Sequence, residues 1–130
     1  MVRRLKQADA HVTAVARGTS DTGVDADDFV AADITTSRGA QAVAAHVQAM
    51  GGAQILVHVA GGSHAPGGGF AALSEDDWTN ELQLNLLSAV RLDRALAPTM
   101  IEAGTGAIVH VVSIQWRMPL YEGTLGYAAA

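Results

Sequence analysis

A serine and a tyrosine near the end of the sequence have the types and the spacing for proton transfer to an oxygen. Ser113 directly follows the apolar run 107–112, and Tyr127 lies fourteen positions further on. A serine hydroxyl at the end of a strand can polarise a carbonyl group, and a tyrosine beside it can pass a proton to or from that oxygen. The pair therefore predicts acid–base chemistry on a carbonyl or an alcohol.

Four short runs rich in β-branched residues predict the strands that position these groups. They cover residues 11–16, 29–32, 54–59 and 107–112. The last two runs are almost continuously apolar, which is typical of strands buried on both faces of a parallel sheet.

Helical patterns alternate with these strands. Thr36 or Ser37 can cap a helix that a glycine pair at 51–52 stops. A second helix follows the capping sequence 74–77 and runs to about residue 103, with Pro98 kinking or ending it. The alternation predicts an α/β fold with a doubly wound parallel sheet and right-handed crossovers. In such a sheet the ligand binds at the carboxyl ends of the strands.

The composition excludes several classes of protein. A chain of 130 residues with 49% hydrophobic and 16% charged residues is expected to form a single globular domain. The net charge of −5 and the scattered cations argue against a nucleic-acid partner. The chain has no cysteine, and no apolar run is long enough to span a bilayer. A cytoplasmic protein without a membrane partner is the expectation.

Several further segments follow one another along the chain in an order that can be compared with known families. They are the strand end 14–17, the segment 32–34 around Asp33, the segment 59–62 around Ala60 and Gly61, and the segment 84–86 around Asn85, followed by Ser113 and Tyr127. Together these segments resemble the short-chain dehydrogenase/reductase family over essentially the whole chain. The family's signature is a serine followed, about thirteen or fourteen residues later, by Tyr-x-x-x-Lys.

The resemblance implies a role for each of these residues. Tyr127 would be the general acid/base, Ser113 would anchor the substrate carbonyl, and Asn85 would order a water of the proton relay. Asp33 would contact the adenine of a nicotinamide cofactor, and the backbone at Ala60 and Gly61 would also line its site. The substrate would be a small carbonyl or alcohol, and the parent protein would be a homo-oligomer, as family members are.

The end of the family's second strand bears on the choice of cofactor. An acidic residue there would bind the ribose 2′-hydroxyl of NAD. In this sequence the place falls at Ala16, and Arg17 comes next, where a cation could pair with a 2′-phosphate. The resemblance therefore favours NADP(H) over NAD(H).

The sequence departs from the family pattern in three places. The glycine-rich phosphate loop and the first strand have no counterpart, and the lysine of Tyr-x-x-x-Lys would fall directly after Ala130. Residues 58–59 read His-Val where the family has Asn-Asn. We therefore expect residues 1–130 to be a partial Rossmann-like domain that lacks its first and its C-terminal strands and is itself inactive. Without the central strand the sheet should split, and its exposed apolar edges should promote aggregation.

Simpler interpretations remain open for several of these residues. Asn85 could bond only within its helix, Asp33 could cap a turn, and Arg17 could be a solvated cation. The histidines 46, 58, 64 and 110 have no carboxylate or thiolate at ligand spacing, so no metal is predicted. The alternative function is that of a non-catalytic remnant, which would bind or dimerise with an intact relative through the long helix.

Overall fold

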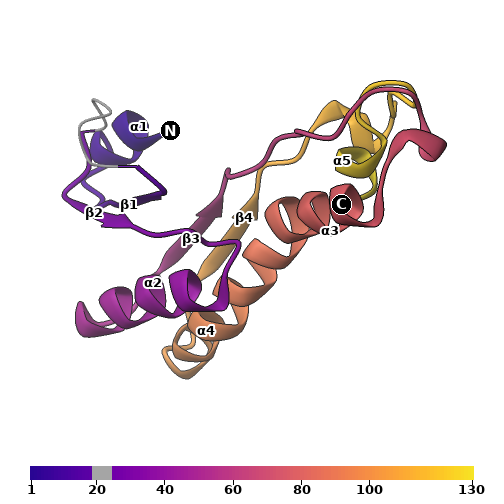
Figure 1. Ribbon diagram of the computed structural model, residues 1–130. Coiled ribbons are helices and arrows are strands. Elements are labelled where there is room, and N and C mark those ends of the chain that lie inside the picture. Colours follow the sequence, from indigo (N-terminus) through magenta and orange to yellow (C-terminus); the bar gives the residue numbers. More distant parts are fainter. Residues whose placement is uncertain (19–24) are drawn as a thin grey trace.

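Strands and helices alternate along the chain in the computed structural model, which describes residues 1–18 and 25–130 (Figure 1). The strands are β1 (Thr13–Ala16), β2 (Asp28–Ala31), β3 (Ile55–His58) and β4 (Ala107–His110). The main helices are α1 (Val2–Lys6), α2 (Ser37–Ala49), α3 (Glu75–Leu82), α4 (Ser88–Glu102) and α5 (Leu125–Ala129). This order confirms the predicted α/β class.

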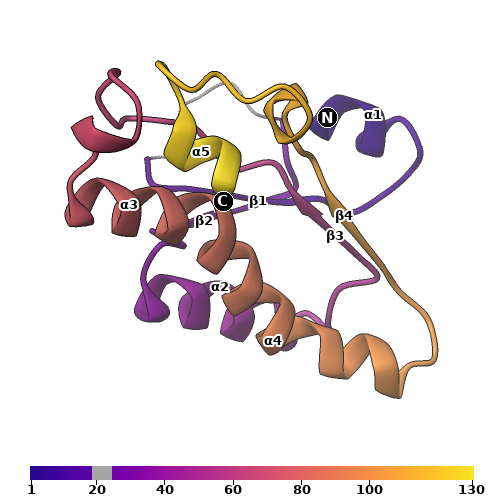
Figure 2. The ribbon, with the colours of Figure 1, turned by 90° about the vertical axis from the view of Figure 1, so that its right-hand side faces the viewer.

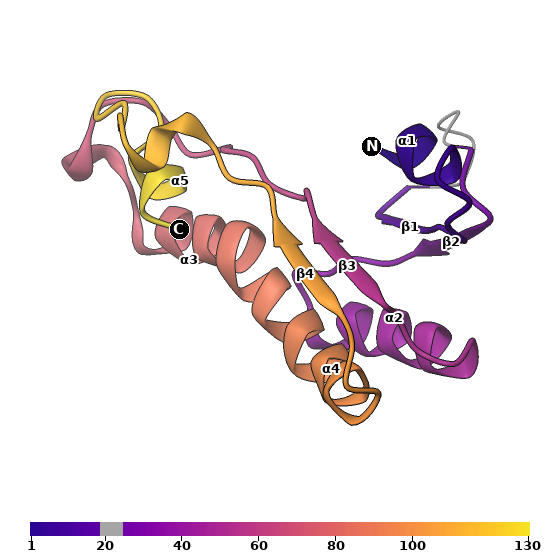
Figure 3. The same ribbon diagram turned by 180° about the vertical axis from the view of Figure 1, so that it is seen from behind.

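The strands form two separate parallel pairs. β1 pairs with β2, with Thr13 opposite Asp28, and β3 pairs with β4, with Ile55 opposite Ala107. Seen from behind, the β3–β4 pair stands apart from the β1–β2 pair (Figure 3). The expected division of the sheet is thereby confirmed among the described residues.

The strands are shorter than the apolar runs that predicted them. The run 107–112 extends two residues past β4, because β3 ends at His58 and offers no further partner. The backbone N–H of Val111 makes the last bond of this ladder, to the carbonyl of His58 (2.9 Å). Residues 111–113 then leave the sheet at the same edge as residues 59–61, so two loops are brought together there.

Helix α2 begins and ends where the sequence predicts. The side chain of Thr36 accepts a hydrogen bond from the backbone N–H of Gly39 (3.0 Å), and Gly51 follows the helix with φ +95°. Gly39 is required for a different reason, because a Cβ there would lie 1.9 Å from the carbonyl oxygen of Asp33. This close approach fixes α2 against the turn that follows β2.

A nearly continuous helical segment runs from residue 75 to residue 102. It opens with the predicted capping box between Ser74 and Asp77 and passes through a π-helical turn, Gln83–Leu87, before α4. Pro98 lies inside α4 and does not end it. Because Pro98 and Arg94 are both exposed, the helix carbonyl that loses its N–H partner can bond to water.

The core lies where α2 and α4 pack against the strands on one side (Figure 2). Ala40, Val43 and Leu92 form its centre, and Val15, Val30 and Leu56 pack against it from strands of both pairs. The opposite face of β4 is bare, and every residue of that strand is exposed. Among the described residues no helix has the length and apolar character needed to cross a membrane.

Candidate active site

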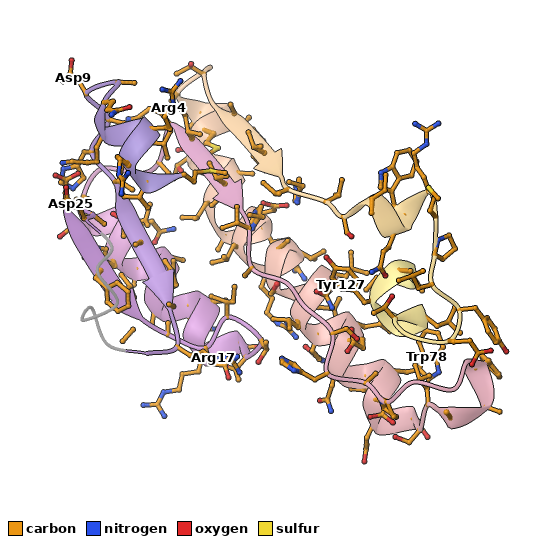
Figure 4. All side chains as sticks on the ribbon, turned by 90° about the horizontal axis from the view of Figure 1, so that it is seen from above. Arg4, Asp9, Arg17, Asp25, Trp78 and Tyr127 are labelled. Atoms are coloured by element: carbon orange, nitrogen blue, oxygen red, sulfur yellow. The ribbon has the colours of Figure 1, made fainter. Side chains whose placement is uncertain are left out.

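Five of the predicted site residues line one cavity of about 400 Å³ at the carboxyl ends of β3 and β4. Ala60 and Gly61 come from the loop after β3, Asn85 from the π-helical turn, Ser113 from the loop after β4, and Tyr127 from α5. The labelled side chains show Tyr127 on the last helix, far from Arg17 at the end of β1 (Figure 4). The structure thus brings the three predicted catalytic residues together, with Arg17 and Asp33 elsewhere.

Ser113 lies in the loop after β4, three residues beyond the strand's last residue, His110, and not directly after a strand as the sequence predicts. It is half-buried and caps the short helical turn Ile114–Trp116, where its hydroxyl oxygen accepts a bond from the backbone N–H of Gln115 (3.3 Å). A serine hydroxyl carries one donor and two acceptor positions. The hydroxyl hydrogen of Ser113 therefore remains available for a substrate oxygen.

Tyr127 is held over the loop after β3 by the packing of α5 on α3. The helix approaches closely because Gly126 is buried, and a Cβ at that position would lie 3.0 Å from Cγ of Glu81. A Cβ on Gly61 would lie 3.9 Å from ring carbon Cε2 of Tyr127. The half-buried Tyr127 ring therefore stands beside Gly61, on the wall of the cavity.

Asn85 occupies the π-helical turn, a distortion that often marks functional sites. Its Oδ1 accepts a bond from the backbone N–H of Gly62 (2.9 Å), and its Nδ2 donates to the carbonyls of Gly62 and Glu81 (3.0 Å each). The side chain thus bonds to both its own helix and the loop after β3. The simpler interpretation of Asn85 as a helix-bonded residue is therefore correct in part.

Glu81 is a site residue that the sequence reasoning missed. It is buried, with 4% of its surface exposed. Its carboxylate accepts bonds from the Ser63 hydroxyl (3.1 Å) and from the backbone N–H groups of His64 (2.9 Å) and Ala65 (3.2 Å). Asn85 Nδ2 lies 3.2 Å from its other oxygen. The spacing of Glu81 and Asn85, one helical turn apart, was the available signal that they share a face.

Asp33 caps a turn, one of the two roles considered for it. Its Oδ1 accepts bonds from the hydroxyl (2.7 Å) and the backbone N–H (3.0 Å) of Thr35. These two bonds hold the pKa of the Asp33 carboxyl below its usual range, and the positive charge of Arg17 lowers it further. Asp33 and exposed Arg17 thus follow adjacent parallel strands, β2 and β1, at the same edge.

A carboxylate lies beside two of the histidines, although none stands at ligand spacing from them in the sequence. Asp93 on α4 lies 2.7 Å from Nε2 of His58 and 3.6 Å from Nε2 of His110. The pairing of His58 and His110 follows from their neighbouring strands, but Asp93 is 35 residues from His58 in the chain, so its approach could not be read from spacing. The fold brings them together because α4 packs on the β3–β4 pair.

The fold is that of a Rossmann-like α/β protein, and it places a serine–tyrosine pair around one cavity at the carboxyl ends of β3 and β4. A sequence profile described as short chain dehydrogenase matches residues 1–130. The chain therefore belongs to the short-chain dehydrogenase family, a family of oxidoreductases, and the resemblance drawn from its motifs is confirmed. An uncharacterized oxidoreductase of Mycobacterium tuberculosis is 40% identical over 55 residues, which are 42% of this chain and 22% of that protein.

Solved structures agree with this assignment. One is a short-chain dehydrogenase/reductase of Burkholderia xenovorans, with 31% identity and a TM-score of 0.86 over 99% of this chain and 52% of that one. Another is the L-sorbose reductase of Gluconobacter frateurii in complex with NADPH and L-sorbose, with 32% identity and a TM-score of 0.78. That match covers 91% of this chain and 48% of the reductase. The chain thus spans about half the length of these solved relatives.

Proposed function

We propose that the protein carrying this chain is an NADP(H)-dependent oxidoreductase that interconverts a small carbonyl compound and its alcohol. The observation that carries the proposal is the meeting of Asn85, Ser113 and Tyr127 around one cavity, beside the small residues Ala60 and Gly61. These are the residues for which the family resemblance implied catalytic and cofactor-binding roles. A bound nicotinamide cofactor would supply or accept the hydride.

The residues present fit such a cofactor. Val59, Ala60 and Gly61 are all exposed and line the cavity, so this part of the loop after β3 presents no side chain larger than valine to it. A Cβ on Gly61 would come within 3.0 Å of Asn85 Oδ1, so the backbone lies close against the site because this residue is glycine. Arg17 and Asp33 would hold the adenosine end, at the edge formed by β1 and β2.

The chain's own residues would handle the proton. Ser113 would donate its hydroxyl hydrogen bond to the substrate oxygen, and Tyr127 would give a proton to that oxygen during reduction or take it during oxidation. Because Nδ2 of Asn85 already serves Gly62 and Glu81, a relay water would bind its spare oxygen lone pair or its main-chain carbonyl. Glu81 would act as a positioning residue by fixing the loop and Asn85.

The catalytic assignment is tested by hydride transfer from NADPH to a panel of carbonyl compounds, with the protein expressed from its complete reading frame. Tyr127→Phe should lower kcat by about a hundredfold or more, since it removes the proton donor. Ser113→Ala should lower it by a similar factor. Tyr121→Phe is the matched control, because Tyr121 is 55% exposed and lies outside the cavity lining. Activity of Tyr127→Phe within tenfold of the parent would refute the assignment.

The preference for NADP(H) rests on Arg17. A guanidinium bonded to a phosphate is a charge-assisted pair, so Arg17→Ala should weaken NADPH binding about tenfold or more and leave NADH binding unchanged. Arg38→Ala, at an exposed position of α2, is the control cation. Titration of the cofactor's fluorescence measures both affinities. If the parent protein bound NADH more tightly than NADPH, the proposed preference for NADP(H) would be wrong.

A binding role is the second candidate, and one observation favours it. Leu86 and Val90, one turn apart, are 41% and 38% exposed along the helical segment, and Ile101 near its end is 77% exposed. An apolar helix surface of this kind suits a second copy of the chain or an intact relative. Light scattering of the purified protein distinguishes a self-associated form from a monomer, and a helix-face variant, Val90→Glu, should then dissociate it without changing the cavity's catalytic groups.

A further inference from the structure

Three side chains from three different elements converge beneath the catalytic cavity. His58 at the end of β3 and His110 at the end of β4 are register partners, and their rings stack with centroids 4.7 Å apart and planes 17° apart. Asp93 reaches the pair from α4, with its two oxygens 2.7 Å and 3.6 Å from the respective Nε2 atoms. One potential ligand atom of each residue lies within 4.8 Å of the others.

The charges of this cluster are unbalanced when both imidazoles are neutral. Among the described residues, the ion-pair partners of Asp93 are these two histidines, and no lysine or arginine shares the carboxylate. The side chain of His58 is only 10% exposed and that of Asp93 28%. When both imidazoles are neutral, Nε2 of His58 donates its hydrogen to Asp93, and the half-buried carboxylate keeps a net negative charge that a cation would neutralise.

We propose that His58, Asp93 and His110 bind one divalent transition-metal ion of the zinc type. Two imidazole nitrogens and one carboxylate oxygen are a donor set suited to Zn²⁺ and Co²⁺, whereas Mg²⁺ and Ca²⁺ prefer all-oxygen sites. Bonds of about 2.0–2.1 Å in a tetrahedral site place neighbouring ligand atoms roughly 3.3 Å apart. His58 and His110 approach different oxygens of Asp93, and their rings lie nearly parallel, with planes 17° apart. Binding one ion would therefore open the contact of His58 with Asp93 by about 0.6 Å and turn the two imidazoles toward a common point.

The fourth ligand position would face a cavity of about 230 Å³ that His58, Asp93 and His110 help to line. Ala60 and Asn85 line both this cavity and the catalytic one. The ion would tie the ends of β3 and β4 to α4, two helical turns after Asn85. We assign it a positioning role: it would fix the two strand ends from which the catalytic loops start.

The direct test is metal binding by the purified protein after chelation and exchange into metal-free buffer. We expect one equivalent of Zn²⁺ by elemental analysis, and a visible d–d spectrum of tetrahedral intensity when Co²⁺ is added instead. Removal of a metal's outer-shell partner typically weakens binding 10–100-fold. Loss of a direct ligand in Asp93→Asn or His110→Asn should therefore weaken Zn²⁺ binding by about a hundredfold or more.

The matched control is His11→Asn. His11 also contacts a carboxylate, with its Nε2 2.6 Å from Asp28, but it has no second histidine beside it. Unchanged binding in this variant, with loss in the Asp93 and His110 variants, would support the proposal. No bound metal in the parent protein, or equal loss in all three variants, would overturn it.

A measurement on the parent protein alone covers the case in which the variants do not fold. Diethyl pyrocarbonate modifies accessible imidazole nitrogens, and His110 is 48% exposed. Peptide mapping with and without Zn²⁺ should show protection of His110 and no protection of His11, which is 58% exposed. Equal modification of His110 under both conditions would also overturn the proposal. Neither measurement depends on catalytic activity, so the metal site and the proposed reductase activity succeed or fail separately.

Discussion

Replacement of Glu81 by glutamine tests whether a buried carboxylate organises the active-site loop. All four groups around the Glu81 carboxylate are donors, as an ionised carboxylate requires. Glutamine keeps the shape but offers one oxygen and one NH₂ group. The three contacts made by one oxygen would become neutral hydrogen bonds, and the fourth would set the new NH₂ against Nδ2 of Asn85.

The magnitude follows from these four contacts. A hydrogen bond to a charged group contributes about 1.5–3 kcal/mol and a neutral one about 0.5–1.5 kcal/mol, so each of three bonds loses about 1 kcal/mol. With the donor–donor conflict at Asn85, the free energy of unfolding should fall by about 3–4 kcal/mol. If the loss is confined to the loop, the backbone N–H groups of His64 and Ala65 should exchange about 150- to 700-fold faster.

Two assays separate these possibilities. Denaturant unfolding of the protein from its complete reading frame reports the global change, and hydrogen exchange with mass spectrometry reports the loop 61–65. Glu102→Gln is the control, because Glu102 is exposed at the end of α4 and should change stability by less than about 0.5 kcal/mol. If Glu81→Gln matched this control in both assays, the carboxylate would not organise the loop.

Three further predictions follow from other contacts. Gly39→Ala should destabilise the protein by about 1–3 kcal/mol, because its Cβ would meet the carbonyl of Asp33; Gly123→Ala, whose nearest atom would be 3.9 Å away, should be close to neutral in the same unfolding assay. Because the pKa of Asp33 is lowered in the folded state, its stabilising contribution is present above about pH 4 and is lost as the pH falls further; unfolding free energies measured between pH 3 and pH 7 should show this loss, and Thr35→Val should reduce it. The chain 1–130 expressed alone should aggregate through the bare β3–β4 pair, and a monomer with one cooperative thermal transition in light scattering and calorimetry would contradict this.

Much of the fold follows from local signals in the sequence. The capping box at Ser74 and the glycines after Met50 fix helix ends through contacts within a few residues, so their bounds were predictable. The end of β4 at His110 was not, because it depends on the length of its partner β3. The π-helical turn at residues 83–87 contains no proline or glycine, so the sequence pattern gave no sign of a distortion there. A helix running through Pro98 likewise depends on exposure, which the sequence pattern did not reveal.

The candidate site, like the fold, was predictable only where its contacts are local in the sequence. Ser113 and Tyr127 were predictable because one follows a strand and the other lies at a family spacing from it. Glu81 and Asp93 were missed because the loop partners of Glu81 lie 16–18 residues away and the histidine partners of Asp93 lie 17–35 residues away. Such contacts exist only once α3 and α4 pack on the loops and strands. The predicted cofactor contacts of Arg17, Asp33, Ala60 and Gly61 stay predictions until a cofactor affinity is measured.

The division of the strands into two pairs has a consequence for how residues 1–130 unfold. Within the described residues, no backbone hydrogen bond joins the β1–β2 sheet to the β3–β4 sheet. The two pairs are connected instead by side-chain packing, in which α2 contacts α4. The described elements β1, β2 and α2 should therefore behave as one foldon and the segment 55–110 as another, and the two should open with different free energies. Amide exchange in β1 and β2 would then speed up under mild denaturant before exchange in β3 does, and the end of the molecule that would hold the adenosine would loosen while the serine–tyrosine cavity stayed closed.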